Sequence, residues 1–332
     1  MTTVFVTHTR DKLDPYFGAR AMQRLKDIAE VRFNPETRDL STQELIAMAH
    51  DCDALIAYRQ TPGPELLFGA LPRLAAFMRC AVDIRTVDVD AASTHGVLVT
   101  QASAGYVAAV AEWVMVVMVD LARGISRYAR AYDRDRPLPA FIGRELRAST
   151  LGVIGFGQIG QYVGDLALAF GMRVRVNTLE PIPPHESLRR VALSQLLAES
   201  DFVVCLAPAN AETQNMMNAH AFAAMQPGAF FINASRGELV DEDALLQALD
   251  SGHLGGCALD VGRAPDQLPS PPLARHPLVI ATPHIGGLTL PAIEHQALET
   301  VAQLASLIRG EMPLGAVNAT RATRLQRWKH TA

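Results

Sequence analysis

Residues 151–160 read Leu-Gly-Val-Ile-Gly-Phe-Gly-Gln-Ile-Gly, an apolar run that leads directly into three glycines spaced as G-x-G-x-x-G. After a strand and at the start of a helix, this spacing is typical of a turn that binds the pyrophosphate of a dinucleotide. Gly155 permits the tight turn, Gly157 lets the backbone approach the phosphates, and Gly160 lets the helix pack closely on the strand. The alternative interpretation is a tight strand–helix turn that binds no ligand.

The helix that follows would present its N-terminus, at Gln158 and Ile159, to the phosphates, with free N–H groups and the positive end of its dipole. An Asp or Glu at the end of the next strand would bind the ribose 2′-hydroxyl of NAD. By spacing, this position falls on Thr178, which is not acidic, while Glu180 lies two residues on. No Arg stands beside Thr178 to attract the 2′-phosphate of NADP, so the turn alone leaves NAD and NADP both open.

Strands and helices alternate on both sides of this turn in a chain of 332 residues, of which 49% are hydrophobic and 19% charged. Such a chain has enough apolar material for two packed domains, and the alternation predicts α/β domains with parallel sheets. We expect strands at residues 4–7, 54–57, 75–79, 97–99, 151–154, 173–177, 202–206, 229–233, 256–261 and 278–281. We expect helices at residues 16–29, 43–49, 64–69, 103–122, 157–170, 188–199, 219–225, 242–251 and 292–309, followed by a polar tail at 321–332.

Charge and composition exclude several classes of protein. The chain has 30 Lys and Arg against 34 Asp and Glu, too even a balance for a nucleic-acid binder. Its four cysteines lie far apart and its ten histidines lack metal-ligand spacing, which favours a reducing compartment and no metal site. Residues 102–119 are almost all apolar, but Glu112 at their centre would be costly in lipid, so we expect a buried helix. We therefore expect a cytoplasmic protein with no membrane or nucleic-acid partner.

Three further segments, with the glycine turn between them, resemble the D-isomer-specific 2-hydroxyacid dehydrogenase family, in particular its glyoxylate/hydroxypyruvate reductase and phosphoglycerate dehydrogenase branches. Residues 233–241, N-A-S-R-G-E-L-V-D, resemble the family's N-x-x-R-G-x-x-V-D signature. Residues 282–287 match its T-P-H-I-G-G, and residues 109–112 resemble the A-V-A-E that opens its inter-domain helix. The resemblance covers nearly the whole chain in the right order.

This resemblance implies a Rossmann-type parallel-sheet cofactor domain inserted in a smaller flavodoxin-like substrate domain. Residues 1–100 and 288–332 would form the substrate domain and residues 101–287 the NAD(P)-binding domain, with the active site in the cleft between them. It also implies NAD as the cofactor, with NADP still possible, and a small 2-oxo or 2-hydroxy acid as the substrate. The long helix at 103–122 resembles the family's dimer-forming region, so we expect a homodimer.

The resemblance places the chemistry on Arg236 and His284. A guanidinium is planar, permanently charged and able to donate two hydrogen bonds to a 2-oxo acid. An imidazole can protonate the developing alkoxide and remove the same proton in the reverse direction. The resemblance thus implies Arg236 as the substrate-polarising residue and His284 as the acid–base.

Relatives pair this histidine with a Glu in a D-V-F-x-x-E-P stretch, and here the sequence departs from them. Residues 260–267 read D-V-G-R-A-P-D-Q. Counting forward from Asp260 puts the Glu position on Pro265, whereas counting back from the histidine allows Asp266. Either Asp266 orients the imidazole, or Asp266 is an exposed loop acid and the histidine works with water or another partner.

A second departure lies in the loop that holds the substrate carboxylate in relatives, where the family has G-x-G-x-D-N. Residues 81–88 here read A-V-D-I-R-T-V-D, without either glycine or the usual Asp. Arg85 in this loop, or Arg59 on another loop, could recognise an additional anionic or polar group, which predicts a substrate larger than glyoxylate or pyruvate. Alternatively, Arg85 pairs with Asp83 or Asp88 structurally. The substrate-binding residues expected are Arg59, Ala81, Val82, Asp83 and Arg85.

The remaining cofactor contacts follow by position in the family. Pro208 and Thr213 lie where relatives hold the adenosine ribose, and Asp260 ends a strand where relatives bind the nicotinamide carboxamide. The full set of cofactor-binding residues expected is Gly155, Gly157, Gln158, Ile159, Gly160, Thr178, Pro208, Thr213, Ala234, Arg236, Asp260, His284 and Gly286.

Two other functions stay open on the sequence. A formate- or phosphite-type dehydrogenase shares the fold, and Gln267 lies near the position where formate-type enzymes carry Gln. A dinucleotide-sensing scaffold, like the co-repressors built on this fold, could keep Arg236 and His284 without turnover. Neither the formate loops nor a long disordered tail is apparent in the sequence.

Overall fold

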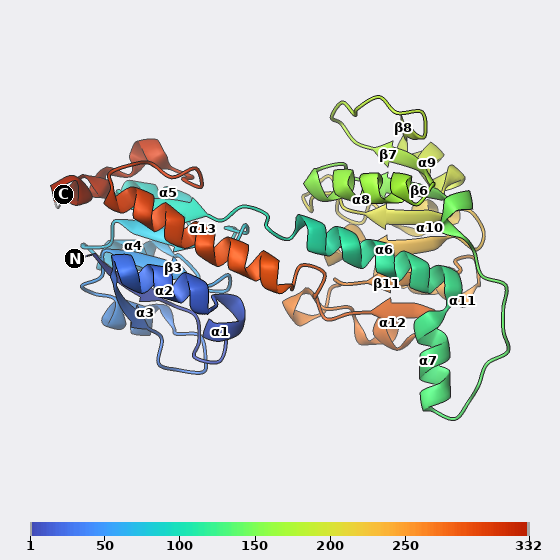
Figure 1. The fold of residues 1–332 in the computed structure, drawn as a ribbon, viewed down its shortest axis with the longest axis horizontal. Helices are drawn as coiled ribbons and strands as arrows, with labels where there is room; N and C mark the ends of the chain where they lie inside the picture. The colour runs from blue at the N-terminus through green and yellow to red at the C-terminus, as the bar shows by residue number, and fades with distance from the viewer. Residues whose placement is uncertain (1, 331–332) are drawn as a thin grey trace. The chain divides into compact units, whose positions relative to one another are not determined.

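The structure is a computed structural model that describes residues 2–330, with the side chains of residues 2–326. The chain forms two compact units (Figure 1). The first unit comprises the residues up to Gly105 together with those from Leu290 on, and the second unit comprises Tyr106–Thr289. Each unit is built around its own parallel sheet.

The sheet of the first unit has the strand order β2-β1-β3-β4-β5, which is the flavodoxin-like order 2-1-3-4-5. All pairings are parallel, and four of the strands are almost entirely buried, as expected when helices cover both faces. The expected strands all form, but β2 was not predicted, because this edge strand, E-V-R-F, is only partly buried and lacks an apolar run. The strands are β1 Thr3–Val6, β2 Glu30–Phe33, β3 Ala54–Ala57, β4 Ala76–Arg79 and β5 Leu98–Gln101.

Helices pack on this sheet from both ends of the chain, and α13 lies beside α2 (Figure 1). The single helix expected at 16–29 is wrong: Gly18, with φ of 82°, separates two helices. The expected polar tail forms two 3-10 segments, Ala319–Arg321 and Thr323–His330, and its last two residues lie outside the described residues. The helices are α1 Leu13–Tyr16, α2 Ala19–Ile28, α3 Thr42–Met48, α4 Glu65–Ala70, α5 Val89–Thr94 and α13 Leu290–Ile308.

The sheet of the second unit has the order β12-β11-β10-β9-β6-β7-β8, again fully parallel. Numbered from β6, this contains the 3-2-1-4-5-6 order of a Rossmann sheet with one more strand beyond it. The helix expected at 188–199 is wrong at its start, because Leu188–Arg190 forms the edge strand β8 beside β7. The strands are β6 Thr150–Ile154, β7 Arg173–Asn177, β8 Leu188–Arg190, β9 Phe202–Cys205, β10 Phe230–Asn233, β11 Gly256–Leu259 and β12 Val279–Ala281.

The longest helix of the second unit, α6, packs along α8 (Figure 1). It begins at Val107, later than expected, and ends at Arg123, and the following Gly124 has a φ of 67°, the left-handed conformation of a helix C-cap. Glu112 is exposed, and within the described residues no helix is long and apolar enough to cross a membrane. The helices are α6 Val107–Arg123, α7 Ile125–Asp133, α8 Gln158–Ala169, α9 Leu193–Glu199, α10 Ala219–Ala223, α11 Glu242–Asp250 and α12 Pro271–Arg275.

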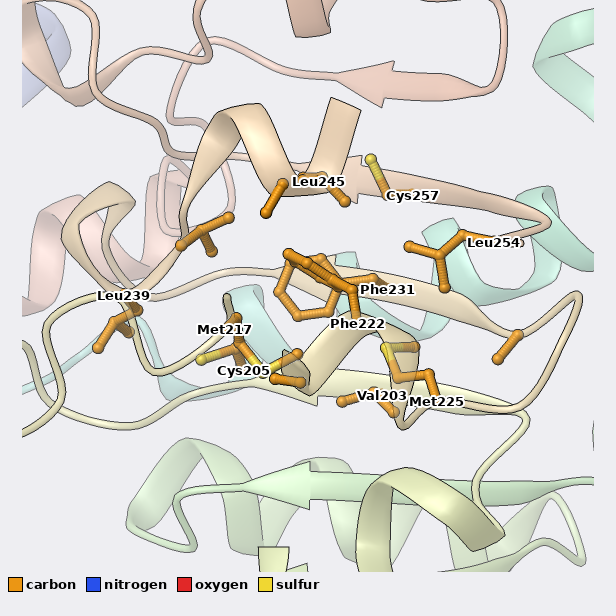
Figure 2. Packing of buried hydrophobic residues seen from close by; sticks show 14 of the residues in the cluster. Val203, Cys205, Met217, Phe222, Met225, Phe231, Leu239, Leu245, Leu254 and Cys257 are labelled. Carbon is orange, nitrogen blue, oxygen red and sulfur yellow. The ribbon is translucent and has the colours of Figure 1, made fainter. Parts of the chain in front are cut away.

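One of the two cores of the second unit is shown in Figure 2, where Phe222 and Phe231 lie between Met217, Met225 and Leu245. The two rings meet edge to face with their centroids 5.3 Å apart, a favourable geometry for aromatic pairs. The chain's four cysteines are free and buried, and two of them lie in this core. Burial raises the pKa of the Cys205 thiol to about 12, so it packs as a small apolar group.

Candidate functional site

The glycine turn between β6 and α8 has the geometry that a phosphate ligand requires. Gly155 has a φ of 91°, and a Cβ there would lie 2.6 Å from the backbone nitrogen of Ala207. A Cβ on Gly160 would collide with the carbonyl oxygen of Gly155, whereas one on Gly157 would meet nothing within 4 Å. No side chain among the described residues caps α8 at Gly157, and the first N–H groups of a helix have no partner within the helix. This turn fits a pyrophosphate.

The residues expected near the adenosine lie on the same edge of the sheet. Thr178 follows β7 and Pro208 follows β9, the two strands that flank β6. The hydroxyl of Thr178 accepts the backbone N–H of Glu180 at 3.2 Å, and Glu180 itself is exposed. The hydroxyl of Thr213 donates to the carbonyl of Pro208 at 2.7 Å and thereby closes the loop after β9.

Asp260, directly after β11, is 3% exposed and binds the loop that carries His284. Its carboxylate accepts the hydroxyl of Thr282 at 2.6 Å, the N–H of Ile285 at 2.8 Å and the N–H of Gly286 at 2.7 Å. A Cβ on Gly286 would lie 2.8 Å from the Asp260 carboxylate, so a larger residue would displace this contact. Sequence reasoning missed this anchoring role, although an acid that follows a buried strand and faces a small-residue loop is a usable signal.

His284 is half-buried and has a φ of 56°, a left-handed conformation that is uncommon for a residue with a Cβ. Its own N–H donates to the carbonyl of Thr282 at 3.0 Å. The hydrogen bonds from Thr282, Ile285 and Gly286 to Asp260 hold the loop on both sides of the histidine and stabilise this conformation. Such a backbone conformation costs about 1–3 kcal/mol. Strain held by surrounding bonds in this way is typical of functional loops.

Arg236 lies on the loop after β10. Hydrogen bonds from the side chains of Asn233 and Ser235 fix the conformation of this loop. The amide of Asn233 donates to the carbonyl of Arg236 at 2.9 Å, and the hydroxyl of Ser235 donates to the carbonyl of Ala207 at 2.6 Å. The guanidinium donates to the carbonyl of Ser235 at 2.8 Å and is half-buried. Ala234, also a predicted cofactor contact, is half-buried on the same loop.

The three residues Arg236, Asp260 and His284 therefore follow three neighbouring strands, β10, β11 and β12. The carboxyl ends of parallel strands lie at one edge of the sheet, and the glycine turn follows β6 at that same edge. The structure thus brings a cation, a buried carboxylate and an imidazole to the edge where α/β sheets bind their ligands. This arrangement suits proton transfer to an anionic carbonyl substrate beside a dinucleotide.

Asp266 lies in a short 3-10 turn, Pro265–Gln267, and is exposed with a φ of 60°. Arg263 fastens this loop to the segment after Arg236: its Nε donates to the carbonyl of Val240 at 3.0 Å and its Nη2 to that of Glu238 at 3.0 Å. Sequence reasoning missed this role of Arg263.

A glycine pair lies beneath the same loop. A Cβ on Gly237 would collide with the carbonyl oxygen of Gly262. The close approach of the two backbones here depends on Gly237, whereas a Cβ on Gly262 would lie 2.6 Å from the carbonyl oxygen of Leu268. The loop that holds Asp266 therefore lies directly against the residue that follows Arg236.

The substrate residues expected in the first unit lie after β3 and β4. Arg85 pairs with Asp83, with Nε 3.1 Å from Oδ1 and Nη2 2.8 Å from Oδ2, which is the structural pairing left open above. Arg59 is exposed after β3, Ala81 is buried and Val82 is half-buried. Within residues 2–330 no group of three His, Cys, Asp or Glu side chains is arranged to hold a metal ion.

Residues 115–286 match the family model of the D-isomer specific 2-hydroxyacid dehydrogenase, NAD binding domain. Over 285 residues the chain is 32% identical to D-3-phosphoglycerate dehydrogenase of Bacillus subtilis, covering 83% of this chain and 53% of that protein. Over 308 residues it is 32% identical to glyoxylate reductase of Thermococcus kodakarensis, covering 90% and 92%. The chain thus spans about half the length of the phosphoglycerate dehydrogenases that it matches.

The fold is also similar to solved structures. The TT0316 protein from Thermus thermophilus superimposes with a TM-score of 0.83 at 31% identity, covering 95% of this chain and all of that one. The two parallel-sheet units agree with this match, and the glycine turn and the loops of Arg236 and His284 lie within the residues that match the family model. The chain belongs to the D-isomer-specific 2-hydroxyacid dehydrogenase family.

Proposed function

We propose that this chain is an NAD(P)-dependent D-2-hydroxyacid dehydrogenase that reduces a 2-oxo acid, with the first unit binding the substrate and the second the cofactor. One observation carries the proposal. The loops of Arg236 and His284 flank the buried Asp260 at the edge of the Rossmann sheet that also bears the open glycine turn. A nicotinamide cofactor bound there supplies or accepts a hydride at the substrate's C2.

The protein's own residues bind and orient the substrate and protonate its oxygen on C2. Arg236 donates hydrogen bonds to the carboxylate and oxo oxygens of the substrate, which polarises the carbonyl. His284 gives its proton to the oxygen on C2 during reduction and removes it during oxidation. Asp266 is our candidate for the carboxylate that stabilises the protonated imidazole, because it lies on the loop fastened to the segment after Arg236.

The cofactor's phosphate preference follows from the residues around the adenosine. Thr178 and Glu180 follow β7, and no arginine lies beside Thr178 in the sequence. The nearest arginines after that strand are Arg189 and Arg190 on the edge strand β8. Arg190 pairs in register with Val176 near the end of β7, which keeps NADP as the alternative. We propose NAD as the preferred cofactor, because the matching family model is an NAD binding domain.

Exposed apolar side chains on and just beyond α6 and α7 support a homodimer. Val116 is 66% exposed on α6, Ile125 and Tyr132 are 57% and 70% exposed on α7, and Ile142 beyond α7 is fully exposed. Exposed apolar side chains that form one contiguous patch are typical of an interface, and we propose that these side chains form one. Free buried cysteines fit the reducing cytoplasm, where we place the enzyme.

One experiment tests the activity. A panel of 2-oxo acids, from glyoxylate and pyruvate to larger and dicarboxylic acids, is mixed with NADH and with NADPH, and the loss of nicotinamide absorbance is followed. We expect turnover of at least one acid, and we expect it to be faster with NADH than with NADPH. The substitutions Arg236→Gln and His284→Asn should each abolish this turnover. Turnover of formate or phosphite with NAD⁺ instead, or NADH binding with no turnover of any acid, contradicts the proposal in favour of the two alternative functions.

A further inference from the structure

Arg79, the last residue of β4, is the largest fully buried side chain of the described residues. Its guanidinium donates to the carbonyl of Tyr58, to the carbonyl of Thr61 at 2.8 Å and to the hydroxyl of Thr86 at 2.9 Å. It also lies over the ring of Phe77, 5.6 Å from the centroid. One side chain therefore joins the loop after β3 to the loop after β4.

The charge of this guanidinium is only partly compensated. Within residues 2–326 no carboxylate is hydrogen-bonded to it, and burial lowers its pKa to about 10. The negative charge of Asp83 raises the pKa of Arg79 and so opposes the effect of burial, yet the Asp83 carboxylate already accepts hydrogen bonds from Arg85. Residues 79–85 thus hold two guanidinium groups and one carboxylate, so this segment carries a net positive charge.

Stability alone does not account for such a residue. Burying a cation without a bonded counter-ion is costly, and an apolar side chain in its place is often neutral or stabilising. The loop after β3 lies at the switch point of the sheet, between β1 and β3, where α/β sheets bind ligands outside the carboxyl ends of their strands. A buried charge acts strongly over short distances there, because little water screens it.

We propose that Arg79 is a positioning residue for the substrate, which fixes the loops of residues 58–61 and 80–86 and adds a positive field that favours an anionic occupant. The inference rests on the proposed function, since that function assigns substrate binding to the first unit, whose expected substrate residues Arg59 and 81–83 lie on these two loops. Arg79 acts through these loops and leaves proton and hydride transfer to the second unit. Its removal should therefore weaken substrate binding more than it slows the chemical step.

The test compares variants by their kinetics with the best 2-oxo acid of the panel. Arg79→Gln removes the charge, and we expect KM to rise about tenfold or more while kcat changes less than about threefold. Arg79→Lys keeps the charge but loses part of the donor set, so its KM should fall in between. Arg73→Gln, which breaks the exposed pair with Asp53 at the other end of the strands, is the control and should leave KM unchanged.

A second pair of variants keeps the test decisive if Arg79→Gln does not fold. Thr86→Val removes one acceptor of the guanidinium with little change in size, and Thr86→Ser restores the hydroxyl. We expect a KM about threefold higher for Thr86→Val and normal for Thr86→Ser, with faster hydrogen exchange at residues 80–86 in the valine variant alone. A purely structural role would lower kcat through a smaller folded fraction and leave KM unchanged.

The outcomes separate the two proposals. If the wild-type chain reduces a 2-oxo acid and KM stays unchanged in every folded variant of Arg79 and Thr86, the inference is wrong and the proposed function stands. If the wild-type chain binds NADH and reduces no 2-oxo acid, the proposed function fails and the substrate part of the inference fails with it. Normal hydrogen exchange in both loops of Thr86→Val would overturn the positioning role as well.

Discussion

The carboxylate of Asp260 accepts the backbone N–H of Gly286 at 2.7 Å, two residues beyond His284 on a different strand end. This bond and its neighbour from Ile285 fix a loop whose histidine has a left-handed backbone. A residue expected to contact the cofactor thus also fixes the loop of His284, the proposed acid–base residue.

Asp260→Asn keeps the volume of the side chain but puts an amide donor where the N–H of Gly286 needs an acceptor. Hydrogen bonds to charged groups contribute about 1.5–3 kcal/mol, so we expect kcat/KM to fall about tenfold to a hundredfold. Asp201→Asn is the matched control. Asp201 accepts the N–H of Thr150 and Arg144, both at 2.8 Å, at the opposite edge of the sheet, so this change should lower Tm and leave kcat/KM intact. Equal losses in both variants would contradict the anchoring role.

Gly157→Ala and Gly160→Ala should separate ligand binding from folding. A methyl group on Gly157 points into open space, so Tm should stay the same while the Kd of NADH rises about tenfold. A methyl group on Gly160 collides with the carbonyl oxygen of Gly155, so Tm should fall. Thermal melts and NADH fluorescence titrations measure both quantities. Unchanged NADH binding in Gly157→Ala would argue against a pyrophosphate at this turn.

Asp266→Asn tests the carboxylate partner of His284. A nearby carboxylate raises the pKa of an imidazole, and reduction needs the protonated form. If Asp266 has this role, its neutralisation lowers the pKa of His284, and the alkaline limb of the kcat/KM profile for reduction moves to lower pH. Asp243→Asn, on the first turn of α11, serves as a control of equal charge change. An unchanged profile in Asp266→Asn would remove this residue from the mechanism.

His8 makes the first unit sensitive to acid. Burial lowers the pKa of this histidine from 6.5 to about 3, because its ring packs between Phe17 and Tyr58. Below pH 6.5 His8 is protonated in the unfolded chain but stays neutral in the folded chain, so the free energy of unfolding falls as the pH decreases. Between pH 6.5 and 5 we expect a loss of about 2 kcal/mol, measured by denaturant unfolding.

His8→Phe should remove most of this acid-side loss, since a phenyl ring keeps the packing against the two aromatic neighbours and cannot be protonated. His220→Gln, at an exposed histidine on α10, should leave the pH dependence as it is in the wild-type chain. The same slope in His8→Phe as in the wild-type chain would show that other groups cause the acid sensitivity.

The elements that the sequence predicts well are those with a continuous apolar run. The strand Arg173–Asn177 has the predicted bounds, and the glycine turn lies between a strand and a helix as its spacing requires. The edge strands β2 and β8 were missed, because a strand paired on one side only keeps polar residues and has no periodic signal.

The sequence predicts the site residues that belong to a local motif, but it does not predict residues whose role depends on contacts with distant parts of the chain. The loops of Arg236 and His284 stand out in the sequence as signatures. By contrast, the roles of Arg79 and Arg263 depend on carbonyl groups that lie 18–25 residues away along the chain, and no local pattern predicts such partners. Arg79 was not predicted, although a charged residue that ends an apolar run is a signal in the sequence that could have identified it.

The second unit starts and finishes at a single point: a Cβ on Gly287 would lie 3.1 Å from the Cβ of Tyr106. A unit whose two ends lie close together can be replaced by a homologous unit, because the rest of the chain does not have to span a gap between the two connection points. On the proposed function, the second unit could accordingly be exchanged for that of a relative, which would change the preference for NAD or NADP without redesigning the unit proposed to bind the acid.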